Sequence, residues 1–473
     1  MSRGSYCGLT APPAQTIAFL GDYLPRKCGI ATFTSDLLTA VADEHPQGRC
    51  FAVPVNDIKP GYDYPDVVRF EIEEQDVASY HRAAHFINSS NVDVVSVQHE
   101  FGIFGGPAGS HLLELVRRLK VPVVTTLHTV LPQPNFDQHR VMQELITRSS
   151  RLVVMTQRGR QILQEAYHAP VAKIDLIPHG IPDVPFLDPN DYKKRFGVEG
   201  RLVLLTFGLL SPNKGIEIVL NALPQIAAEF PAVVYIVLGA THPNELRERG
   251  EAYRLGLELL ARKNKVESNV IFHNRFVELE QLTEFIGAAD LYTTPYLDEA
   301  QITSGTLAYA FGAGKAVVST PYWHAAELLK DGRGVLVPFG DTQAMAREVT
   351  GLLRDTARRN AIREHAYKLG REMIWSNVAR LYMRSFERAR VTEAVVSREP
   401  LAPRMLVQRP RELPELSLNY LAQMNGSTVI SGVPFSLRRT SPKATARMTP
   451  PDRSGCGRWP CPPRFSSTRS GWA

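Results

Sequence analysis

From residue 292 to residue 321 the chain reads YTTPYLDEAQITSGTLAYAFGAGKAVVSTP. The pattern predicts a strand over 290–294, a polar loop, a helix that begins at Ser304 and ends at Gly312 or Gly314, and then a second strand. A serine before an apolar run is an N-cap signal, and a glycine behind one is a C-cap signal. The backbone N–H groups at such a helix start are free and carry partial positive charge, which suits a phosphate group. A packed βαβ unit without any ligand is the other interpretation of the same pattern.

The same alternation of strands and helices extends outward through most of the chain. Short apolar runs predict strands at 16–21, 49–55, 67–71, 91–98, 121–127, 152–155, 174–177, 201–208, 232–238, 270–273 and 335–338. Helical spacing of apolar residues predicts helices at 32–41, 77–87, 110–119, 141–149, 158–166, 216–230, 244–263, 279–288, 323–330, 342–353 and 375–390. Strands that are apolar on both faces and alternate with helices are typical of parallel sheets covered by helices.

A segment rich in Pro and Asp, 179–191, divides this pattern into two blocks. The fold class we predict is therefore α/β, with two Rossmann-like, doubly wound parallel-sheet domains that face a central cleft. The N-terminal domain covers 16–184, and the C-terminal domain covers 185–395. We expect residues 1–15 to be flexible and residues 396–473 to form a disordered tail.

Composition excludes several classes of protein. The 473 residues are 44% hydrophobic and 22% charged, as in ordinary globular proteins. The net charge is +6, but much of the excess lies in the Arg-rich segment after Val391, so we expect no nucleic-acid partner for the folded part. The five cysteines lack paired C-x-x-C spacing and predict reduced thiols in a cytoplasmic protein. Because no apolar run has the length of a signal or spanning segment, we expect no transmembrane helix; peripheral membrane contact stays open.

Polar side chains follow several predicted strands, and ligands of doubly wound sheets bind beyond the carboxyl ends of strands. These residues are His99, His128, Lys214, His242 and Ser304. In the sequence SPNKG, Lys214 can act as a point cation for a diphosphate, or it can be a solvated lysine at a helix start. His128 can donate a hydrogen bond to a substrate hydroxyl, or it can be a satisfied core histidine.

Two further polar pairs deserve separate interpretations. His99 and Glu100 can orient a loop or bind an acceptor, and they lack the second histidine at helical spacing that a zinc site requires. Asp298 and Glu299 can form a carboxylate site. Adjacent loop residues usually point apart, so we expect at least one of these two to be solvated.

Taken together, the motifs resemble a known family. Gly29 in the first loop, TLHT at 126–129, SPNKG at 211–215 and GAGKAVVST at 312–320 are similar to the retaining GT-B glycosyltransferases of family 4, the group 1 glycosyltransferases. HEFGIFGG at 99–106 resembles a bacterial subgroup of that family. The resemblance covers roughly residues 16–390.

The resemblance implies that the domain over 185–395 binds a nucleoside-diphosphate sugar as donor and that the domain over 16–184 is the acceptor-side domain. It also implies no tightly bound cofactor or metal. Lys214 would contact the diphosphate, and His128 would reach the transferred sugar. Gly29 would let the first loop approach the donor. The amides that would cap the diphosphate are those of Ser304, Gly305 and Thr306.

The chain also departs from the family pattern. The two glutamates that the family usually has seven residues apart align with Gln301 and Tyr309, and its usual basic residue before the lysine loop aligns with Leu209. Gln301 can still hydrogen-bond a sugar hydroxyl and Tyr309 a ribose or base, but neither can act as a charged base. The catalytic effects that remain are positioning of the substrates and electrostatic stabilisation of the leaving diphosphate. Glu299 or its neighbour Asp298 would partly substitute for the missing carboxylate.

The leading functional hypothesis is transfer of a hexose to an unidentified carbohydrate or lipid-linked acceptor with retention of configuration. Mannose from a guanosine diphosphate donor is a guess. An epimerase or a phosphorylase of the same fold is a second hypothesis. An epimerase would need added acid/base carboxylates in the cleft and a phosphorylase a pyridoxal lysine, and the sequence shows neither signature. The third is a catalytically silent nucleotide-sugar-binding or partner subunit, because both usual glutamates are replaced.

The tail has its own signals. LPELSLNYLAQM, at 413–424, resembles the start of an extra helical domain found in longer relatives. Segment 441–450, back-translated and read one frame over, can encode PEGYCTDDA, which is similar to a signature of that domain. We therefore hypothesise that residues after about Gly432 are an out-of-frame translation, and we expect no packed structure after about Leu421.

Overall fold

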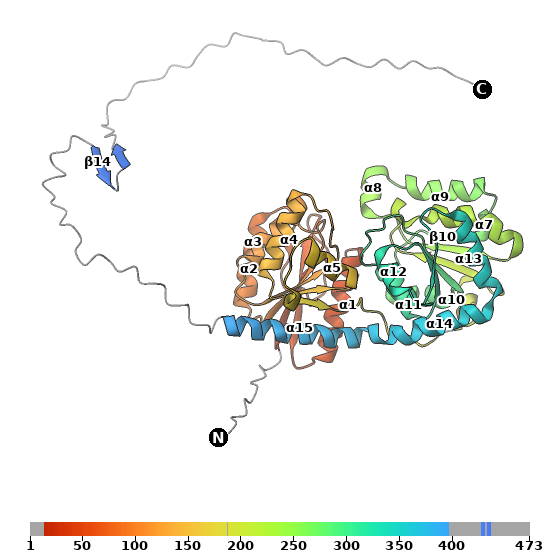
Figure 1. The fold of residues 1–473 in the computed structure, drawn as a ribbon, viewed down its shortest axis with the longest axis horizontal. Coiled ribbons are helices and arrows are strands. Elements are labelled where there is room, and N and C mark those ends of the chain that lie inside the picture. The colour runs from red at the N-terminus through yellow and green to blue at the C-terminus, as the bar shows by residue number, and fades with distance from the viewer. Residues whose placement is uncertain (1–13, 187, 397–426, 431–432, 437–473) are drawn as a thin grey trace, which may run out of the picture. The chain divides into compact units, whose positions relative to one another are not determined.

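The computed structural model describes residues 14–186, 188–396, 427–430 and 433–436 (Figure 1). The chain divides into two compact units, residues 1–400 and 401–473, and each is described by itself. The expected flexibility of residues 1–15 falls almost wholly outside the described residues. The same holds for most of the expected tail and for the proposed shift of reading frame.

The N-terminal half of the first unit is built on a seven-stranded parallel sheet with the order β3-β2-β1-β4-β5-β6-β7. Its strands are β1 (Thr16–Gly21), β2 (Arg49–Asn56), β3 (Ile72–Glu73), β4 (Val94–His99), β5 (Val123–Leu127), β6 (Arg151–Val154) and β7 (Ile174–Leu176). Its helices are α1 (Gly29–Glu44), α2 (Val77–Ser89), α3 (His111–Val116), α4 (Phe136–Arg148) and α5 (Gln157–Glu165). Every residue of β1, β4 and β5 is buried, as a sheet covered on both faces requires.

The C-terminal half repeats the plan with a six-stranded parallel sheet of order β10-β9-β8-β11-β12-β13. Its strands are β8 (Val203–Phe207), β9 (Val234–Leu238), β10 (Val270–His273), β11 (Leu291–Thr294), β12 (Ala316–Ser319) and β13 (Val335–Leu336). Its helices are α6 (Asn190–Lys193), α7 (Ile216–Glu229), α8 (Pro243–Arg249), α9 (Ala252–Lys263), α10 (Leu279–Ala288), α11 (Gly305–Gly312), α12 (Trp323–Leu328), α13 (Thr342–Arg354) and α14 (Thr356–Gly370). The predicted pair of doubly wound sheets is confirmed.

The order of strands in each sheet indicates where a ligand can bind. In each sheet the order reverses between two adjacent strands, β1 and β4 in the first and β8 and β11 in the second. Loops that leave the carboxyl ends of strands on either side of such a point diverge and leave a crevice between them. The loops after β1, β8 and β11 are therefore the ones that carry the site described below.

Two local predictions were wrong, and one helix was not predicted. The strand predicted at 67–71 is displaced to β3, and only Val68 of that segment bridges to β2. The single helix predicted at 244–263 breaks into α8 and α9 at Gly250, whose φ of 59° and ψ of −140° suit glycine and end a helix. Helix α14 was not predicted, because Arg359 and Arg363 lie among its buried residues and interrupt its apolar face.

The last helix, α15 (Trp375–Val396), follows the C-terminal half in sequence but packs on the N-terminal half. Its buried residues Tyr382 and Phe386 join the core formed by β1 and α1. The Tyr382 hydroxyl lies 3.0 Å from the Thr126 hydroxyl of β5, and Ser385 donates a hydrogen bond of 2.7 Å to Asp175 of β7. Figure 1 shows α15 running beneath the N-terminal half, so the chain crosses between the halves twice.

The second unit contains one described feature, the antiparallel pair of β14 (Ser427–Ile430) and β15 (Val433–Ser436). Our expectation for the tail did not include these strands.

Among the described residues, no helix combines the length and the apolar character needed to cross a bilayer.

Candidate functional site

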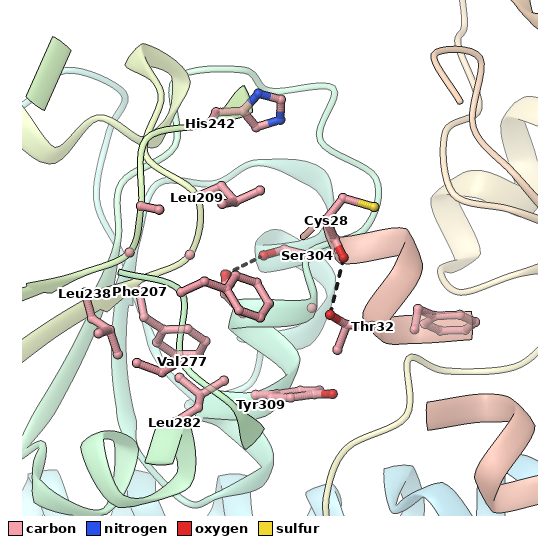
Figure 2. Close-up of a pocket in the computed structure, with 18 of the residues that line it drawn as sticks. Cys28, Thr32, Phe207, Leu209, Leu238, His242, Val277, Leu282, Ser304 and Tyr309 are labelled. Carbon is pink, nitrogen blue, oxygen red and sulfur yellow. Dashed lines mark hydrogen bonds between the residues drawn. The ribbon is translucent and has the colours of Figure 1, made fainter. Parts of the chain in front are cut away.

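A cavity of about 460 Å³ lies between the two halves of the first unit (Figure 2). One wall comes from the β1–α1 loop and the first turns of α1, including Gly29, Phe33 and Asp36. The other comes from the loops after β8 and β11 and from the start of α11. Figure 2 shows one corner of this cavity, which we call the apolar corner, formed by Phe207, Leu238, Val277 and Leu282.

The SPNKG turn brings Lys214 to this cavity. Gly215 has φ +61°, and a Cβ there would meet the carbonyl oxygen of Pro295 at 2.0 Å, so the turn packs directly against the loop after β11. The Lys214 ammonium donates a hydrogen bond of 2.7 Å to the Tyr296 hydroxyl and lies 4.0 Å from the centre of its ring. Leu209, in the position where the family usually has a cation, also lines the cavity.

Tyr296 connects Lys214 to the start of α11. Its hydroxyl lies 2.9 Å from the Thr306 hydroxyl, and its ring stacks on Tyr322 with 4.9 Å between ring centroids. Burial by itself would raise the pKa of Tyr296, but the Lys214 charge and hydrogen bonds from Lys214, Thr306 and Ser304 bring this pKa below its ordinary value. The cation and the helix start therefore form one connected group.

The amides at the start of α11 are not equivalent. The Ser304 side chain caps the helix by accepting from the Leu307 amide at 3.3 Å, while the Ser304 amide donates to Nδ1 of His324 at 2.8 Å. Burial lowers the pKa of His324 to about 3, which keeps the ring a neutral acceptor. Within the described chain, the Gly305 and Thr306 amides donate to no protein acceptor. Two of the three predicted amides are thus free for a ligand.

Tyr309 and Asp36 join the two halves across the cavity. The Tyr309 hydroxyl donates a hydrogen bond of 2.6 Å to Oδ2 of Asp36 on α1. Burial raises the pKa of Asp36 to about 6, although the bond from Tyr309 opposes this shift. Where the family pattern leads one to expect a glutamate on α11, this chain has a phenol, and the carboxylate comes from the opposite half.

His179 was missed by sequence reasoning, which treated its segment only as a linker. It lines the cavity, and its Nδ1 donates to the Gly180 carbonyl at 2.7 Å, which leaves Nε2 as an unprotonated acceptor. Burial lowers the pKa of His179 to about 4. A Cβ on Gly305 would lie 2.9 Å from that Nε2, so glycine permits the approach. The available signal was the place of His179 in the loop that leaves the carboxyl end of β7.

Of the predicted catalytic residues, only Gln301 lines the cavity, and its side-chain amide donates to the Thr303 carbonyl at 2.6 Å. His128 is buried behind Phe33, with 4.8 Å between the ring centroids, and its Nε2 lies 3.1 Å from Oε1 of Gln98. Burial lowers the pKa of His128 to about 3. Glu299 is exposed and lies outside the cavity lining, as does its neighbour Asp298.

His99 and Glu100 have different surroundings. His99 is fully buried, neither of its ring nitrogens has a hydrogen-bond partner in the described chain, and burial lowers its pKa to about 3. Glu100 accepts hydrogen bonds from the Thr129 hydroxyl at 2.5 Å and the Phe101 amide at 2.9 Å. Glu100 therefore fixes two loops at the sheet edge, whereas His99 packs against the Phe101 ring.

A second cavity of about 1160 Å³ adjoins the first and lies mostly in the N-terminal half. The two cavities share lining residues, namely Cys28, Gly29, Leu209 and His242. Glu100 contributes to the second cavity only. In the part of the chain that the structure describes, no group of three His, Cys, Asp or Glu side chains is arranged to hold a metal ion.

Comparison with known proteins gives family matches in both halves of the chain. Residues 201–355 match the family model described as "Glycosyl transferases group 1", and residues 37–183 match the model "Glycosyltransferase Family 4". The chain is 30% identical over 220 residues to a phosphatidyl-myo-inositol mannosyltransferase of Mycolicibacterium smegmatis, which is 45% of this chain and 51% of that protein. It is 28% identical over 287 residues to a D-inositol 3-phosphate glycosyltransferase of Xylanimonas cellulosilytica, which is 55% of this chain and 65% of that protein.

Solved structures agree on the fold. Anabaena HepE in complex with UDP and glucose matches with a TM-score of 0.62 at 19% identity and covers 81% of this chain and 100% of its own. Sucrose-phosphate synthase from Thermosynechococcus elongatus matches with a TM-score of 0.64 at 16% identity and covers 79% of this chain and 99% of its own. The chain spans between half and two thirds of the curated relatives above, and the family models match both of its halves. The chain has the GT-B fold and belongs to the family 4, or group 1, glycosyltransferases.

Proposed function

We propose that the protein transfers a hexose from a nucleoside-diphosphate sugar to an acceptor hydroxyl, with retention of configuration. One observation carries this proposal: the Lys214 ammonium and the free amides of Gly305 and Thr306 line the same cavity. A cation beside a helix N-terminus is a site for a dianion such as a diphosphate. The apolar corner of the same cavity suits the flat face of a nucleobase.

In this reaction the bond between the anomeric carbon and the diphosphate oxygen breaks, and the acceptor hydroxyl oxygen bonds to that carbon. The hydroxyl proton leaves with the diphosphate oxygen. Lys214 and the two amides stabilise the charge that develops on the leaving group. Gln301 and Nε2 of His179 face the same cavity and position the sugar hydroxyls. Because one curated relative is named a mannosyltransferase, mannose is the first hexose to test.

The test is ligand-induced thermal stabilisation of the full chain with a panel of nucleoside diphosphates and their mannose and glucose esters. One base should stand out, and its shift should shrink in Lys214→Ala but not in Lys263→Ala, an exposed lysine on α9. The selected sugar nucleotide should then be consumed when an acceptor is supplied. If no nucleotide shifts the melting temperature, the donor site and the transferase proposal are both refuted.

A silent binding or partner subunit remains the second proposal. It is favoured by one specific observation, the neutral residues Leu209, Gln301 and Tyr309 at positions where the family usually has charge. This alternative predicts a nucleotide-dependent thermal shift without turnover of any sugar nucleotide. Sustained release of nucleoside diphosphate in the presence of an acceptor would exclude it.

A further inference from the structure

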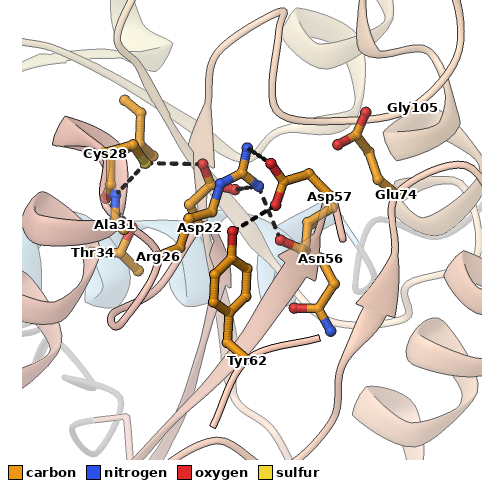
Figure 3. Close-up of polar contacts among 12 residues, drawn as sticks. Asp22, Arg26, Cys28, Ala31, Thr34, Asn56, Asp57, Tyr62, Glu74 and Gly105 are labelled. Carbon is orange, nitrogen blue, oxygen red and sulfur yellow. Dashed lines mark hydrogen bonds and ion pairs between the residues drawn. The ribbon is translucent and has the colours of Figure 1, made fainter. Parts of the chain in front are cut away.

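Two of the loops that line the first cavity are held in different ways. The β1–α1 loop is fixed within its own half by an ion network (Figure 3). Arg26 donates a hydrogen bond of 2.8 Å from Nη1 to Asp22, and its Nη2 lies 3.5 Å from Asp57. The Cys28 thiol also donates to Asp22, at 3.1 Å, and accepts from the Ala31 amide at 3.3 Å. All of these residues belong to the N-terminal half.

The loop after β11 is held by α12 instead, over residues 299–304, which we call the Gln301 loop. The Trp323 amide donates to the Glu299 carbonyl at 3.0 Å, and the His324 amide donates to the Gln301 carbonyl at 3.2 Å. The ring of His324 also accepts a bond of 2.8 Å from the amide at the end of the loop. Three backbone groups of the loop therefore bond to the first two residues of α12, so the position of the loop depends on that helix.

Helix α12 is in turn anchored to α5, which belongs to the N-terminal half. The Glu327 carboxylate accepts hydrogen bonds from the amides of Gln157 and Arg158, at 2.9 and 3.3 Å. These are the first two amides of α5, which have no acceptor within their own helix, and the partial positive charge at a helix start favours a carboxylate. The Arg158 guanidinium also lies 5.0 Å from the centre of the Trp323 ring. Figure 1 shows α5 and α12 facing each other where the two halves meet.

The Gln301 loop also contacts the N-terminal half directly. Ile302 is buried in a core cluster that includes Leu127 of β5 and Ile162 of α5. The contact is close because α5 has a glycine at this point: a Cβ on Gly159 would lie 3.1 Å from Cδ1 of Ile302. Gln301, the residue before Ile302, lines the first cavity. Gln301 is thus held between α12 and the N-terminal half.

The Gln301 side chain has one atom left for a ligand. Its N–H donates to the Thr303 carbonyl at 2.6 Å, whereas no described residue donates to its side-chain oxygen. That oxygen can accept a bond from a sugar hydroxyl while the loop holds it in the cavity. The groups proposed to bind the diphosphate are held separately, because Tyr296 links Lys214 to Thr306. A displaced Gln301 loop should therefore affect a bound sugar more than a bound diphosphate.

From these contacts we infer that Glu327 is a positioning residue: it anchors the Gln301 loop to the N-terminal half, so the sugar part of the first cavity is complete only while α5 and α12 are joined. Glu327 does not line the cavity and acts through α12 and the loop. The inference rests on the proposed function and deepens it, since it makes binding of the sugar depend on a contact between the halves. The diphosphate part depends on Lys214 and α11 of the C-terminal half.

The first measurement is isothermal titration of the full chain with two pairs of probes, GDP with GDP-mannose and UDP with UDP-glucose. For the base that binds, Glu327→Ala should lower the affinity for the sugar nucleotide about three- to tenfold, the size expected for one lost hydrogen bond. The affinity for the nucleoside diphosphate should stay within about twofold of the wild type. Glu327→Gln should give an intermediate loss, because an amide oxygen is a weaker acceptor than a carboxylate and brings no charge to the helix start.

The second measurement, hydrogen exchange of the protein without ligand, monitors the loop itself. The amides of Ser304, Trp323 and His324 should exchange at least about tenfold faster in Glu327→Ala, because the helix that holds the loop has lost its anchor. Exchange in the SPNKG turn should not change. Glu387→Gln, at an exposed position of α15, is the matched control and should alter neither exchange nor affinity.

The outcomes separate the inference from the proposed function. Equal losses of affinity for both members of a probe pair, or an unchanged affinity for the sugar nucleotide in Glu327→Ala, overturn the inference. Unchanged exchange of the Gln301 loop also overturns it. If Glu327→Ala does not fold, Glu327→Gln, which keeps the shape of the side chain, takes its place in both measurements. If the wild type binds none of the four nucleotides, the proposed function is refuted, and exchange alone decides whether Glu327 holds the loop.

Discussion

The two cavities differ in the charged side chains that line them. The first cavity, the proposed donor site, has Lys214 beside the free amides of α11 and an apolar corner, and Arg275 also lines it. The second cavity is lined by ten charged side chains, of which Arg26 is fixed between Asp22 and Asp57. A leaving diphosphate needs positive dipoles that are already oriented, whereas sugar hydroxyls need acceptors. The first cavity therefore combines a cation with free backbone amides, whereas the second has a lining rich in charges of both signs.

The largest expected effect comes from breaking the turn that holds Lys214. Gly215→Ala places a Cβ 2.0 Å from the Pro295 carbonyl oxygen and in a left-handed backbone conformation, so the turn must move. We expect at least a tenfold loss of donor affinity and a clear fall in melting temperature, measured by calorimetry. Gly197→Ala is the matched control, because Gly197 has φ +64° and open space around it. That control should cost only about 1–2 kcal/mol of stability and no donor affinity. Equal behaviour of the two variants would mean that the turn does not position the donor.

A smaller effect is expected at the start of α11. Gly305→Ala brings a Cβ to 2.9 Å from Nε2 of His179, so the histidine is displaced and the path to the two free amides narrows. Donor affinity should fall about three- to tenfold in isothermal titration. Gly256→Ala, on α9 with open space around it, should keep donor affinity and gain up to about 1 kcal/mol of stability. Unchanged donor affinity in Gly305→Ala would contradict the placement of the diphosphate at this helix start.

Asp36 allows a pH test of the junction between the halves. Its pKa is raised to about 6 by burial, so between about pH 4 and pH 6 the folded protein binds more protons than the unfolded chain. The contribution of Asp36 to stability is therefore fully present below about pH 4 and is lost as the pH rises through 6. The free energy of unfolding of Asp36→Asn should lack this loss, a difference of about 3 kcal/mol between the two pH limits. Parallel pH profiles for wild type and variant would show that this carboxyl does not titrate as described.

The smallest effect is a gain. Leu209→Arg introduces a further cation into the first cavity, at the position where the family usually has one. We expect a two- to fivefold lower dissociation constant for the nucleoside diphosphate, and the gain should weaken as salt concentration rises. Affinity for the free nucleoside should not change, which serves as the internal control. A loss of affinity for the diphosphate would show that Leu209 supports the donor through packing.

Sequence alone predicted the two sheets, the SPNKG turn and the start of α11, because each depends on local periodicity and capping signals. It did not predict the partner of Tyr309, since Asp36 lies 273 residues away in the chain. It also placed His128 at a strand end correctly without indicating that Phe33 covers its ring. The hydrogen bond from the Ser304 amide to His324 could not be predicted from sequence for the same reason. Local patterns fix elements, whereas the side chains that meet across two domains are fixed only by the packing of the whole.

Helix α15 has a consequence for how the protein is made. The core of the N-terminal half includes Val378, Tyr382 and Phe386, which leave the ribosome only after the entire C-terminal half has been synthesised. Domains usually fold in order as they emerge, but here the first half lacks part of its core until residue 386 is available. During that interval the apolar surface that α15 covers is open to chaperones or to aggregation. A truncation before α15 should therefore yield an insoluble N-terminal half rather than an independent domain.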